Sequence, residues 1–262
     1  MELEVVHKPA ADPKHQVVFV HGMWHGAWCW EQFQDYFAER GCESWALSLR
    51  GHGRSGGRAG RLTPRLADYV ADVASVAERA GGNPIVVGHS MGGGVIRHFL
   101  AGGGRAKAAI FAAPVPADGP MGFMVRMARR RPLAFTKSMC MLDTKHWVDS
   151  PELCRELLYQ ETTPADVVSS TQANLGPESY RAGLALFGLP RLKHPCGIPA
   201  LVVTGDRDGS FTLGEGRKTA TAWGCDFTPL VGASHDLMLE PGWEKAAQAM
   251  VDWIDQKVTQ DL

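Results

Sequence analysis

The segment Pro84-Ile85-Val86-Val87-Gly88-His89-Ser90-Met91-Gly92-Gly93-Gly94-Val95 decides the fold of this chain. A short apolar run, typical of a buried strand, leads into the pentapeptide Gly-x-Ser-x-Gly, and a second apolar run follows it. Glycines at 88 and 92 suit a strand-to-helix turn so tight that a Cβ at either position would clash with neighbouring backbone. Such a turn holds Ser90 at its tip, facing the N–H groups of the next helix, which can stabilise an oxyanion. The segment therefore predicts a nucleophilic serine at the end of a strand rather than a merely structural turn.

Strands and helices are predicted to alternate on both sides of this segment. The run at 16–20 is nearly all apolar, as expected for a central strand of a parallel sheet that is covered on both faces. Further strands are predicted at 42–49, 106–112, 200–204 and 227–231, with an edge strand at 3–7. The pattern predicts an α/β fold with a mostly parallel central sheet, flanked by helices and joined by right-handed crossovers.

Three helices of this core have recognisable limits. Trp30, Phe33 and Phe37 fall at helical spacing, and Gly41 is placed to end their helix. Thr63 is predicted to cap a second helix, because the Pro64 that follows it suits a first helical turn. The last helix is predicted from an apolar face made of Trp243, Ala246, Ala247, Met250 and Ile254.

The alternation stops at about Asp118 and resumes after Leu189. Ser150-Pro151 and Thr163-Pro164 within this block are typical helix starts, and the block is too long for a connecting loop. We predict a helical lid at 118–189, inserted between a first core segment, 1–117, and a second, 190–262. Its methionines either shape an adaptable apolar pocket or are ordinary packing residues; they are Met121, Met124, Met127, Met139 and Met141.

Composition limits the range of functions. The chain has 262 residues, 45% of them hydrophobic, which is enough for one sizeable core. A net charge of −1 favours neither nucleic acid nor an anionic membrane as a partner and leaves small molecules as substrates. No apolar run approaches the roughly 18 residues that span a bilayer, and the acidic start, 1–4, is unlike a secretion signal, so we expect a cytoplasmic protein.

The six cysteines are scattered without Cys-x-x-Cys pairs. This spacing favours reduced, mostly buried thiols over a disulfide framework or a zinc site. We therefore expect no metal and no cofactor. The oligomeric state stays open between a monomer and a homodimer.

Two loops after predicted strands carry the groups that a nucleophilic serine needs. A serine hydroxyl requires an imidazole to take its proton and a carboxylate to orient that imidazole. His235 follows the last predicted strand and is the expected base. Asp208 is preferred as the acid, because a turn that begins at Gly205 should bring the third residue after it back over the sheet edge. Asp206 would then be a turn-stabilising or solvent-facing residue, and Asp118 is a more distant candidate.

With these residues in place, the chain resembles the α/β-hydrolase superfamily over essentially its whole length, and most closely its esterase and hydroxynitrile-lyase group. The resemblance implies that the backbone N–H groups of Met23 and Met91 form the oxyanion hole. The motifs that carry it are His21-Gly22-Met23-Trp24-His25-Gly26-Ala27-Trp28, Arg50-Gly51-His52-Gly53-Arg54-Ser55, Gly88-His89-Ser90-Met91-Gly92, Gly205-x-x-Asp208 and His235-Asp236-Leu237-Met238-Leu239.

The same resemblance separates several reactions. The related lyases have a threonine in place of Gly22 and a lysine in place of Asp236, so hydrolysis is favoured. Epoxide hydrolases and dehalogenases resemble the chain less, because they have an aspartate in place of Ser90. We expect a serine hydrolase that cleaves a carboxylic ester through an acyl-enzyme. The alternatives are a hydroxynitrile-lyase-like or C–C bond hydrolase activity, or a receptor-like protein that binds a ligand with little turnover.

The substrate is expected to be a small or medium apolar ester, since ligand sites are mostly apolar with a few polar groups. The Arg129-Arg130-Arg131 run is either a solvated face or, if one arginine turned inward, a site for a carboxylate-bearing substrate. The residues expected to line the pocket are Gly22, Trp24, His25, His89, Met124 and Trp147.

Overall fold

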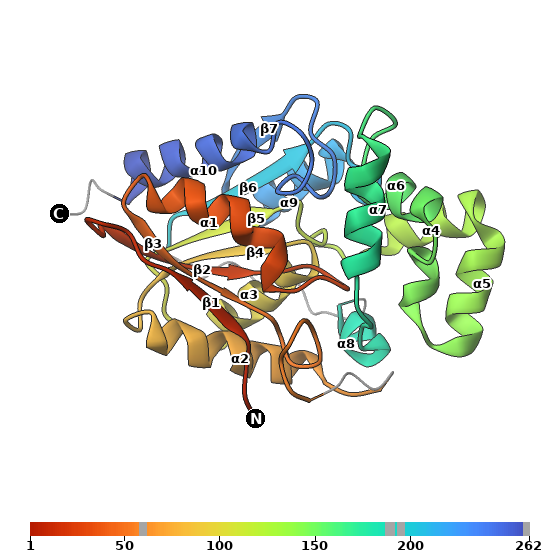
Figure 1. The fold of residues 1–262 in the computed structure, drawn as a ribbon, viewed down its shortest axis with the longest axis horizontal. Coiled ribbons are helices and arrows are strands. Elements are labelled where there is room, and N and C mark those ends of the chain that lie inside the picture. Colours follow the sequence, from red (N-terminus) through yellow and green to blue (C-terminus); the bar gives the residue numbers. More distant parts are fainter. Residues whose placement is uncertain (58–61, 187–191, 193–196, 259–262) are drawn as a thin grey trace.

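The computed structural model describes residues 1–57, 62–186, 192 and 197–258, and its centre is a seven-stranded sheet in the order β1-β3-β2-β4-β5-β6-β7 (Figure 1). Strand β1 pairs with β3 in antiparallel orientation, and the other neighbouring strands pair in parallel. The predicted mostly parallel sheet with an edge strand at its start is therefore confirmed. The strands are β1 (Val5–Lys8), β2 (His15–Val20), β3 (Cys42–Leu47), β4 (Ile85–His89), β5 (Ala108–Ala112), β6 (Ala200–Gly205) and β7 (Asp226–Leu230).

Helices cover both faces of the sheet, and alternate residues of the strands fill two separate cores. Val17 and Phe19 of β2 pack with helices α1 (Glu31–Ala38) and α10 (Glu244–Lys257), together with the 3-10 helix η1 (Ala27–Trp30). Val18 and Val20 pack on the other face, with α2 (Leu66–Arg79), α3 (Met91–Ala101) and α9 (Leu213–Trp223). Because both faces are buried, 17–20 of β2, 85–87 of β4 and all of β5 are apolar.

A helical insertion joins β5 to β6 and forms the right-hand part of Figure 1. It lies where the predicted helical block lies, although 187–189 at the end of that block and 190, 191 and 193–196 beyond it are outside the described residues. Its elements are α4 (Met121–Arg130), α5 (Pro132–Met141), the 3-10 helix η2 (Thr144–Trp147), α6 (Pro151–Leu158), α7 (Ala165–Asn174) and α8 (Tyr180–Ala185).

Three helix starts were predicted from serine or threonine followed by proline. The hydroxyl of Ser150 accepts a hydrogen bond from the Leu153 N–H (3.3 Å), with Pro151 as the first residue of α6. The start predicted at Thr163-Pro164 is found within one residue, because Pro164 occupies the N-cap position of α7. The prediction was wrong for the Thr63 cap, since α2 begins at Leu66 and the side chain of Asp68 accepts the N–H of Arg65 (2.7 Å) instead. A cap has to precede the first helical residue directly, and the proline does not take that first position in these two helices.

Strand β3 ends at Leu47 rather than at Leu49. Ser48 still donates to the carbonyl of Glu4 (2.9 Å), in line with the pairing of β1 and β3, whereas the Leu49 N–H donates to a side chain, Nε2 of His21 (3.0 Å). The backbone pairing of this strand therefore stops before Leu49.

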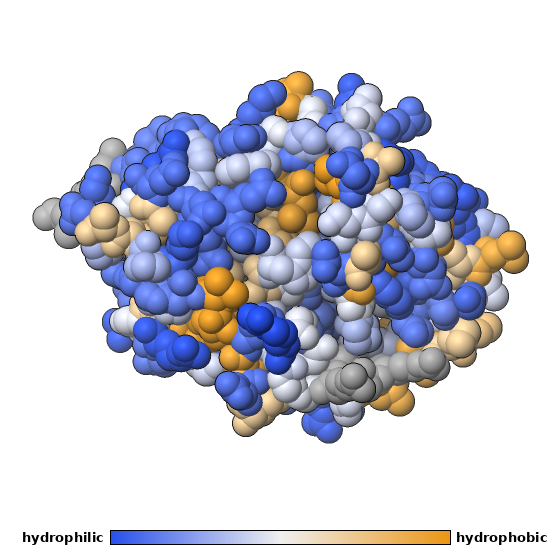
Figure 2. Space-filling view, in the orientation of Figure 1, coloured by the Kyte–Doolittle hydropathy of each residue, from blue (hydrophilic) through white to orange (hydrophobic). Residues whose placement is uncertain are grey.

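The surface is largely hydrophilic in the view of Figure 2, with small separate hydrophobic patches. None of the helices within the described residues has the length and apolar character needed to cross a membrane. In that same part of the chain the five cysteines are free thiols, and Cys196 lies outside it.

Candidate active site

Ser90 lies at the turn between β4 and α3, where the predicted segment places it. Its backbone has φ +50° and ψ −114°, a strained conformation for a residue with a Cβ, and its N–H donates to the Ala112 carbonyl of β5 (2.9 Å). A Cβ added to Gly88 would lie 2.6 Å from the Gly92 carbonyl oxygen, and one added to Gly92 would overlap the Val20 carbonyl. Both glycines are therefore required for the close approach that exposes the serine hydroxyl.

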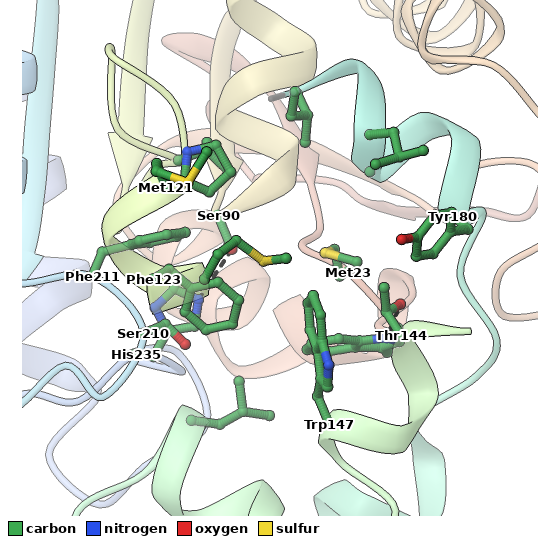
Figure 3. Close-up of a pocket in the computed structure, with 18 of the residues that line it drawn as sticks. Met23, Ser90, Met121, Phe123, Thr144, Trp147, Tyr180, Ser210, Phe211 and His235 are labelled. Atoms are coloured by element: carbon green, nitrogen blue, oxygen red, sulfur yellow. Dashed lines mark hydrogen bonds between the residues drawn. The ribbon is translucent and has the colours of Figure 1, made fainter. Parts of the chain in front are cut away.

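Three side chains that are far apart in the sequence form one hydrogen-bonded series. Nε2 of His235 lies 3.0 Å from the Ser90 Oγ, and Nδ1 of His235 lies 2.9 Å from Oδ2 of Asp208. Figure 3 shows Ser90 and His235 joined in this way at the cavity. The Asp208 side chain is fully buried, whereas Ser90 keeps 8% of its surface exposed. This arrangement can take a proton from the serine and hold it on the imidazole.

The two aspartates that competed for the acid position make different contacts. Oδ1 of Asp208 accepts the N–H groups of Ser210 and Phe211 (both 2.7 Å), which fixes its other oxygen toward His235. Asp206 accepts the N–H of Gly232 (2.7 Å) and so ties two loops together, and Asp118 is exposed. Of the three, the structure brings Asp208 to His235.

Burial and neighbouring charge act in opposite directions on His235. Burial favours the neutral imidazole, but the charge of Asp208, its hydrogen bond and then the charge of Asp236 favour the protonated form. The balance raises the pKa of His235 above that of an ordinary histidine. The same charges would stabilise an imidazolium that forms when Ser90 loses its proton.

Two other buried histidines next to the site bind backbone. Nδ1 of His21 donates to the Gly22 carbonyl (2.7 Å) while its Nε2 accepts from Leu49, so His21 is neutral. Nε2 of His89 donates to the His235 carbonyl (3.0 Å). Burial, followed by the nearby charge of His235, lowers the pKa of His89 to about 3, so it is neutral as well. Both rings therefore hold the loops that surround the serine.

The loop that carries Met23 is strained and held at several points. Trp24 has φ +66°, its indole N–H donates to Thr144 Oγ1 (3.1 Å), and its carbonyl accepts from the Gly176 N–H (2.7 Å). A Cβ at Gly22 would lie 2.7 Å from Nδ1 of His89 and 3.1 Å from the Ser90 Cβ. Glycine is thus needed at 22 to make room for these two side chains. Met91, the other residue expected to supply an oxyanion N–H, is the first residue of α3.

A cavity of about 330 Å³ opens above Ser90, between the sheet and the helical insertion. Of the expected pocket residues, Trp24, His25, His89, Met124 and Trp147 line it. Gly22 does not, because His89 and Ser90 pack against its Cα. Among the methionines in question, Met121, Met124 and Met139 line the cavity, whereas Met127 is buried in the core and Met141 is exposed.

Several lining residues had no signal in the sequence. They come from α4, α5, η2, α6, α8 and the loops after β5 and β6, and which of their faces meets the cavity depends on how the helices pack. Figure 3 shows Phe123, Phe211, Thr144 and Tyr180 around the space above Ser90. The lining residues that the sequence did not predict include Val115, Phe123, Phe135, Thr144, Leu158, Tyr180, Leu186 and Phe211.

The arginine run does not reach the cavity. Arg129, Arg130 and Arg131 are exposed, and Arg131 pairs with Glu156 (2.5 Å). The arginine of α4 that does bind near the site is Arg126, which donates to the Ser210 carbonyl (2.6 Å) and to Glu215 (2.8 and 3.0 Å). The solvated-face interpretation of the run therefore agrees with its position.

The last turn of α6 contacts both loops that carry the proposed acid and base. The Leu157 carbonyl accepts from the Ser210 hydroxyl (2.9 Å), and the Leu158 carbonyl accepts from the Asp236 N–H (3.0 Å). A Cβ at Gly209 would overlap the Glu156 carbonyl, so the loop after β6 packs directly on this turn. Within the described ranges, no group of three or more His, Cys, Asp or Glu side chains could hold a metal ion.

Comparison with known proteins identifies the family of the chain. A model of the alpha/beta hydrolase family matches residues 17–249. A monoacylglycerol lipase of Mycolicibacterium smegmatis is 39% identical over 93 residues, which cover 34% of this chain and 33% of the lipase. A probable esterase of Oryza sativa subsp. indica is 32% identical over 167 residues, which cover 59% of this chain and 63% of the esterase. The chain thus spans less than two thirds of the length of either relative.

A solved structure supports the fold alone. A thermophilic esterase from Thermogutta terrifontis superimposes with a TM-score of 0.74 at 20% identity, over 97% of this chain and 93% of that chain. Because the family model extends over most of the sequence, the chain belongs to the alpha/beta hydrolase family.

Proposed function

We propose that the protein is a serine hydrolase that cleaves a carboxylic ester through an acyl-enzyme. One observation carries the proposal: Asp208, His235 and the Ser90 hydroxyl are linked at 2.9 and 3.0 Å beneath an apolar cavity. Activating a serine in this way is the chemistry that such a series performs. The relatives named as a lipase and an esterase support ester cleavage as the reaction.

The reaction would proceed in two halves. His235 takes the proton of Ser90 as Oγ attacks the ester carbonyl, and the N–H groups of Met23 and Met91 hold the oxyanion. His235 then gives the proton to the departing alcohol, which leaves an acyl group on Ser90. Water, activated by the same imidazole, releases the acid and restores the serine. Asp208 keeps the ring oriented in both halves.

The lining of the cavity favours an apolar substrate of small or medium size. Among the described residues that line it, the titratable side chains are those of His25, His89, His235 and Tyr180, and none is a carboxylate, lysine or arginine. A charged acyl group would therefore lose its hydration on entering the cavity without gaining an oppositely charged partner. We infer that an uncharged acyl or alcohol group occupies the space between Trp24, Phe123 and Trp147.

The chain lacks two groups that a hydroxynitrile-lyase activity would need. A cation at position 236 is replaced by Asp236, which is fully buried and does not line the cavity. A hydroxyl at position 22 is replaced by Gly22, where a side chain would collide with His89. Both differences favour hydrolysis over release of cyanide.

Substitution of the serine tests the proposal. We expect Ser90→Ala to lower kcat on p-nitrophenyl butyrate by at least about 10⁴-fold, because the nucleophile is removed while the fold is kept. It should also abolish covalent labelling by a fluorophosphonate. Ser75→Ala is a matched control, since the Ser75 hydroxyl bonds only within α2, to the Asp72 carbonyl. Turnover that survives Ser90→Ala would refute the assignment.

The same measurements address the receptor-like alternative. If Ser90 is labelled by the fluorophosphonate but no ester in a panel of acyl lengths is turned over, the protein binds rather than hydrolyses. Mass spectrometry of the labelled protein identifies the modified residue. A kcat well above background on any ester of the panel excludes the binding alternative.

A further inference from the structure

His25 and Asp236 form a second pair of imidazole and carboxylate beside the proposed catalytic series. Nε2 of His25 lies 3.0 Å from Oδ2 of Asp236, and Nδ1 of His25 lies 2.7 Å from the Met23 carbonyl oxygen. The exposed fractions of the two residues are 1% for His25 and 0% for Asp236. They are 211 positions apart in the sequence, so the pair exists only in the folded chain.

The hydrogen bonds of His25 fix where its protons are. A backbone carbonyl only accepts, so Nδ1 carries a proton, and the bond between Nε2 and Asp236 contains a second. Burial alone would raise the pKa of Asp236, but the charge and hydrogen bond of His25 lower it below its ordinary value. Asp236 is therefore an ionised carboxylate that accepts a hydrogen bond from the imidazole of His25.

Other groups around the carboxylate do not compete for this proton. Burial, together with the charge of Asp236, raises the pKa of the Tyr159 hydroxyl and that of the Cys29 thiol, so both are neutral. Glu240 also has a raised pKa, mainly because it is buried, and its carboxylate oxygens accept from the N–H and hydroxyl of Ser234 (2.6 and 2.5 Å). His89 donates its proton to the His235 carbonyl instead. The Asp236 charge is therefore directed at His25 and, through space, at His235.

The pair joins the two loops on which the proposed reaction depends. On one side, His25 holds the Met23 carbonyl, in a loop strained at Trp24 and expected to supply an oxyanion N–H. On the other side, Asp236 directly follows His235, and its N–H is fixed by the Leu158 carbonyl. If the Met23 carbonyl moved, the Met23 N–H would turn with it and would no longer point at the oxyanion.

We propose that His25 and Asp236 are positioning residues: their buried hydrogen bond holds the Met23 loop in the geometry of the oxyanion hole and keeps a second carboxylate behind His235. The inference rests on the proposed ester hydrolysis for its catalytic part. Its structural part, the hydrogen-bonded pair, stands without it.

Nitrogen-15 NMR of the histidine rings tests the structural part. In the intact protein, we expect both ring nitrogens of His25, identified by their loss in His25→Gln, to have the chemical shifts of hydrogen-bonded nitrogens. In Asp236→Asn the Nε2 resonance should move, because its partner is changed, whereas the Nδ1 resonance should stay in place. An Nε2 resonance that is the same in Asp236→Asn and in the wild-type protein would overturn the inference.

Kinetics test the catalytic part. Asp236→Asn and His25→Gln should each lower kcat on p-nitrophenyl butyrate by about 10- to 100-fold, with KM changed by no more than about twofold. Each should slow fluorophosphonate labelling of Ser90 by a similar factor. That labelling reads the position of the oxyanion hole even if the natural reaction is not ester hydrolysis, so failure of the proposed function and failure of this inference remain distinguishable. An unchanged kcat and labelling rate in both variants would overturn the catalytic part.

A matched control comes from another buried pair in the same chain. Nε2 of His52 lies 3.0 Å from Oε2 of Glu178, and both side chains are fully buried, but neither bonds to Met23 or to the loop of His235. Glu178→Gln therefore disturbs a similar pair elsewhere, and its melting temperature shows the cost to stability alone. Loss of kcat in Glu178→Gln as large as in Asp236→Asn would mean that the effect is general destabilisation and would refute positioning.

Discussion

Two regions of the molecule bound the cavity, and they hold their side chains by different means. On the sheet side, Ser90 is held by backbone, through glycines at 88 and 92 and a bond to the neighbouring strand. On the helical side, Phe123, Thr144 and Tyr180 reach the cavity from separate helices that contact one another mainly through side chains. The comparison shows that the proposed chemistry rests on rigid backbone, whereas the selection of substrate rests on packing, which tolerates exchange.

The largest effect is expected on the sheet side, at the acid. Asp208→Asn should lower kcat by about 10³- to 10⁴-fold, because the imidazole loses the carboxylate that orients it. Asp206→Asn serves as the control, since Asp206 bonds only to the turn at Gly232 and within its own loop, and should keep kcat within about threefold. Measurement on p-nitrophenyl butyrate distinguishes them. Equal losses of kcat in the two variants would contradict the assignment of Asp208 as the acid and of Asp206 as the turn residue.

The pH dependence of kcat/KM should reflect the protonation of His235, which lies on the sheet side of the cavity. His235 acts as a base only when neutral, so the rate should fall about tenfold per unit as the pH falls below its pKa. Because that pKa is raised, the fall should begin above the pH of about 6.5 at which an ordinary histidine titrates. Removing the charge in Asp236→Asn should move the fall to lower pH. A fall that stays at the same pH in this variant would show that Asp236 does not act on His235.

A smaller effect is expected on the helical side. Met124→Ala enlarges the cavity opposite Ser90 and should shift the preference toward longer acyl chains by up to about tenfold in kcat/KM. The rate of labelling by a small fluorophosphonate should be unchanged, because no group that holds Ser90 is touched. If the labelling rate fell together with ester turnover, the separation between the two regions would be refuted.

The smallest effect is expected at the exposed arginines. Arg129→Gln and Arg130→Gln, alone or together, should leave kcat/KM for neutral esters and for esters of a dicarboxylic half-acid within about twofold, because neither side chain reaches the cavity. A preference for the anionic ester in the wild type that these changes abolish would contradict the apolar cavity.

The sequence predicted the sheet side better than the helical side, and the reason is physical. Gly88, Ser90 and Gly92 are neighbours in the chain, and the turn that they form follows from local backbone geometry. Asp208 could be preferred to Asp206 because loops after parallel strands meet at one edge of the sheet. In contrast, Phe123 and Phe211 meet only after α4 has packed on the loop after β6, and no spacing in the sequence reports that.

Two further differences have the same origin. The cap predicted at Thr63 depended on where α2 begins, which the contact of Asp68 with the Arg65 N–H decides. The pair of His25 and Asp236 joins residues from opposite ends of the chain. No spacing in the sequence indicates that these two residues meet, so the contact is seen only in the folded structure.

The contacts of α6 suggest how this protein can diversify. The main chain at Glu156, Leu157 and Leu158 touches the loops that carry Asp208 and His235, so insertions or deletions there would displace both at once. Among the described residues, α4 and α5 make no backbone hydrogen bond to these loops, and α4 reaches the loop of Asp208 through the Arg126 side chain, which donates to the Ser210 carbonyl. Over evolutionary time, changes in α4 and α5 that keep Arg126 can therefore alter the substrate, while the end of α6 is constrained together with the loops of the proposed acid and base.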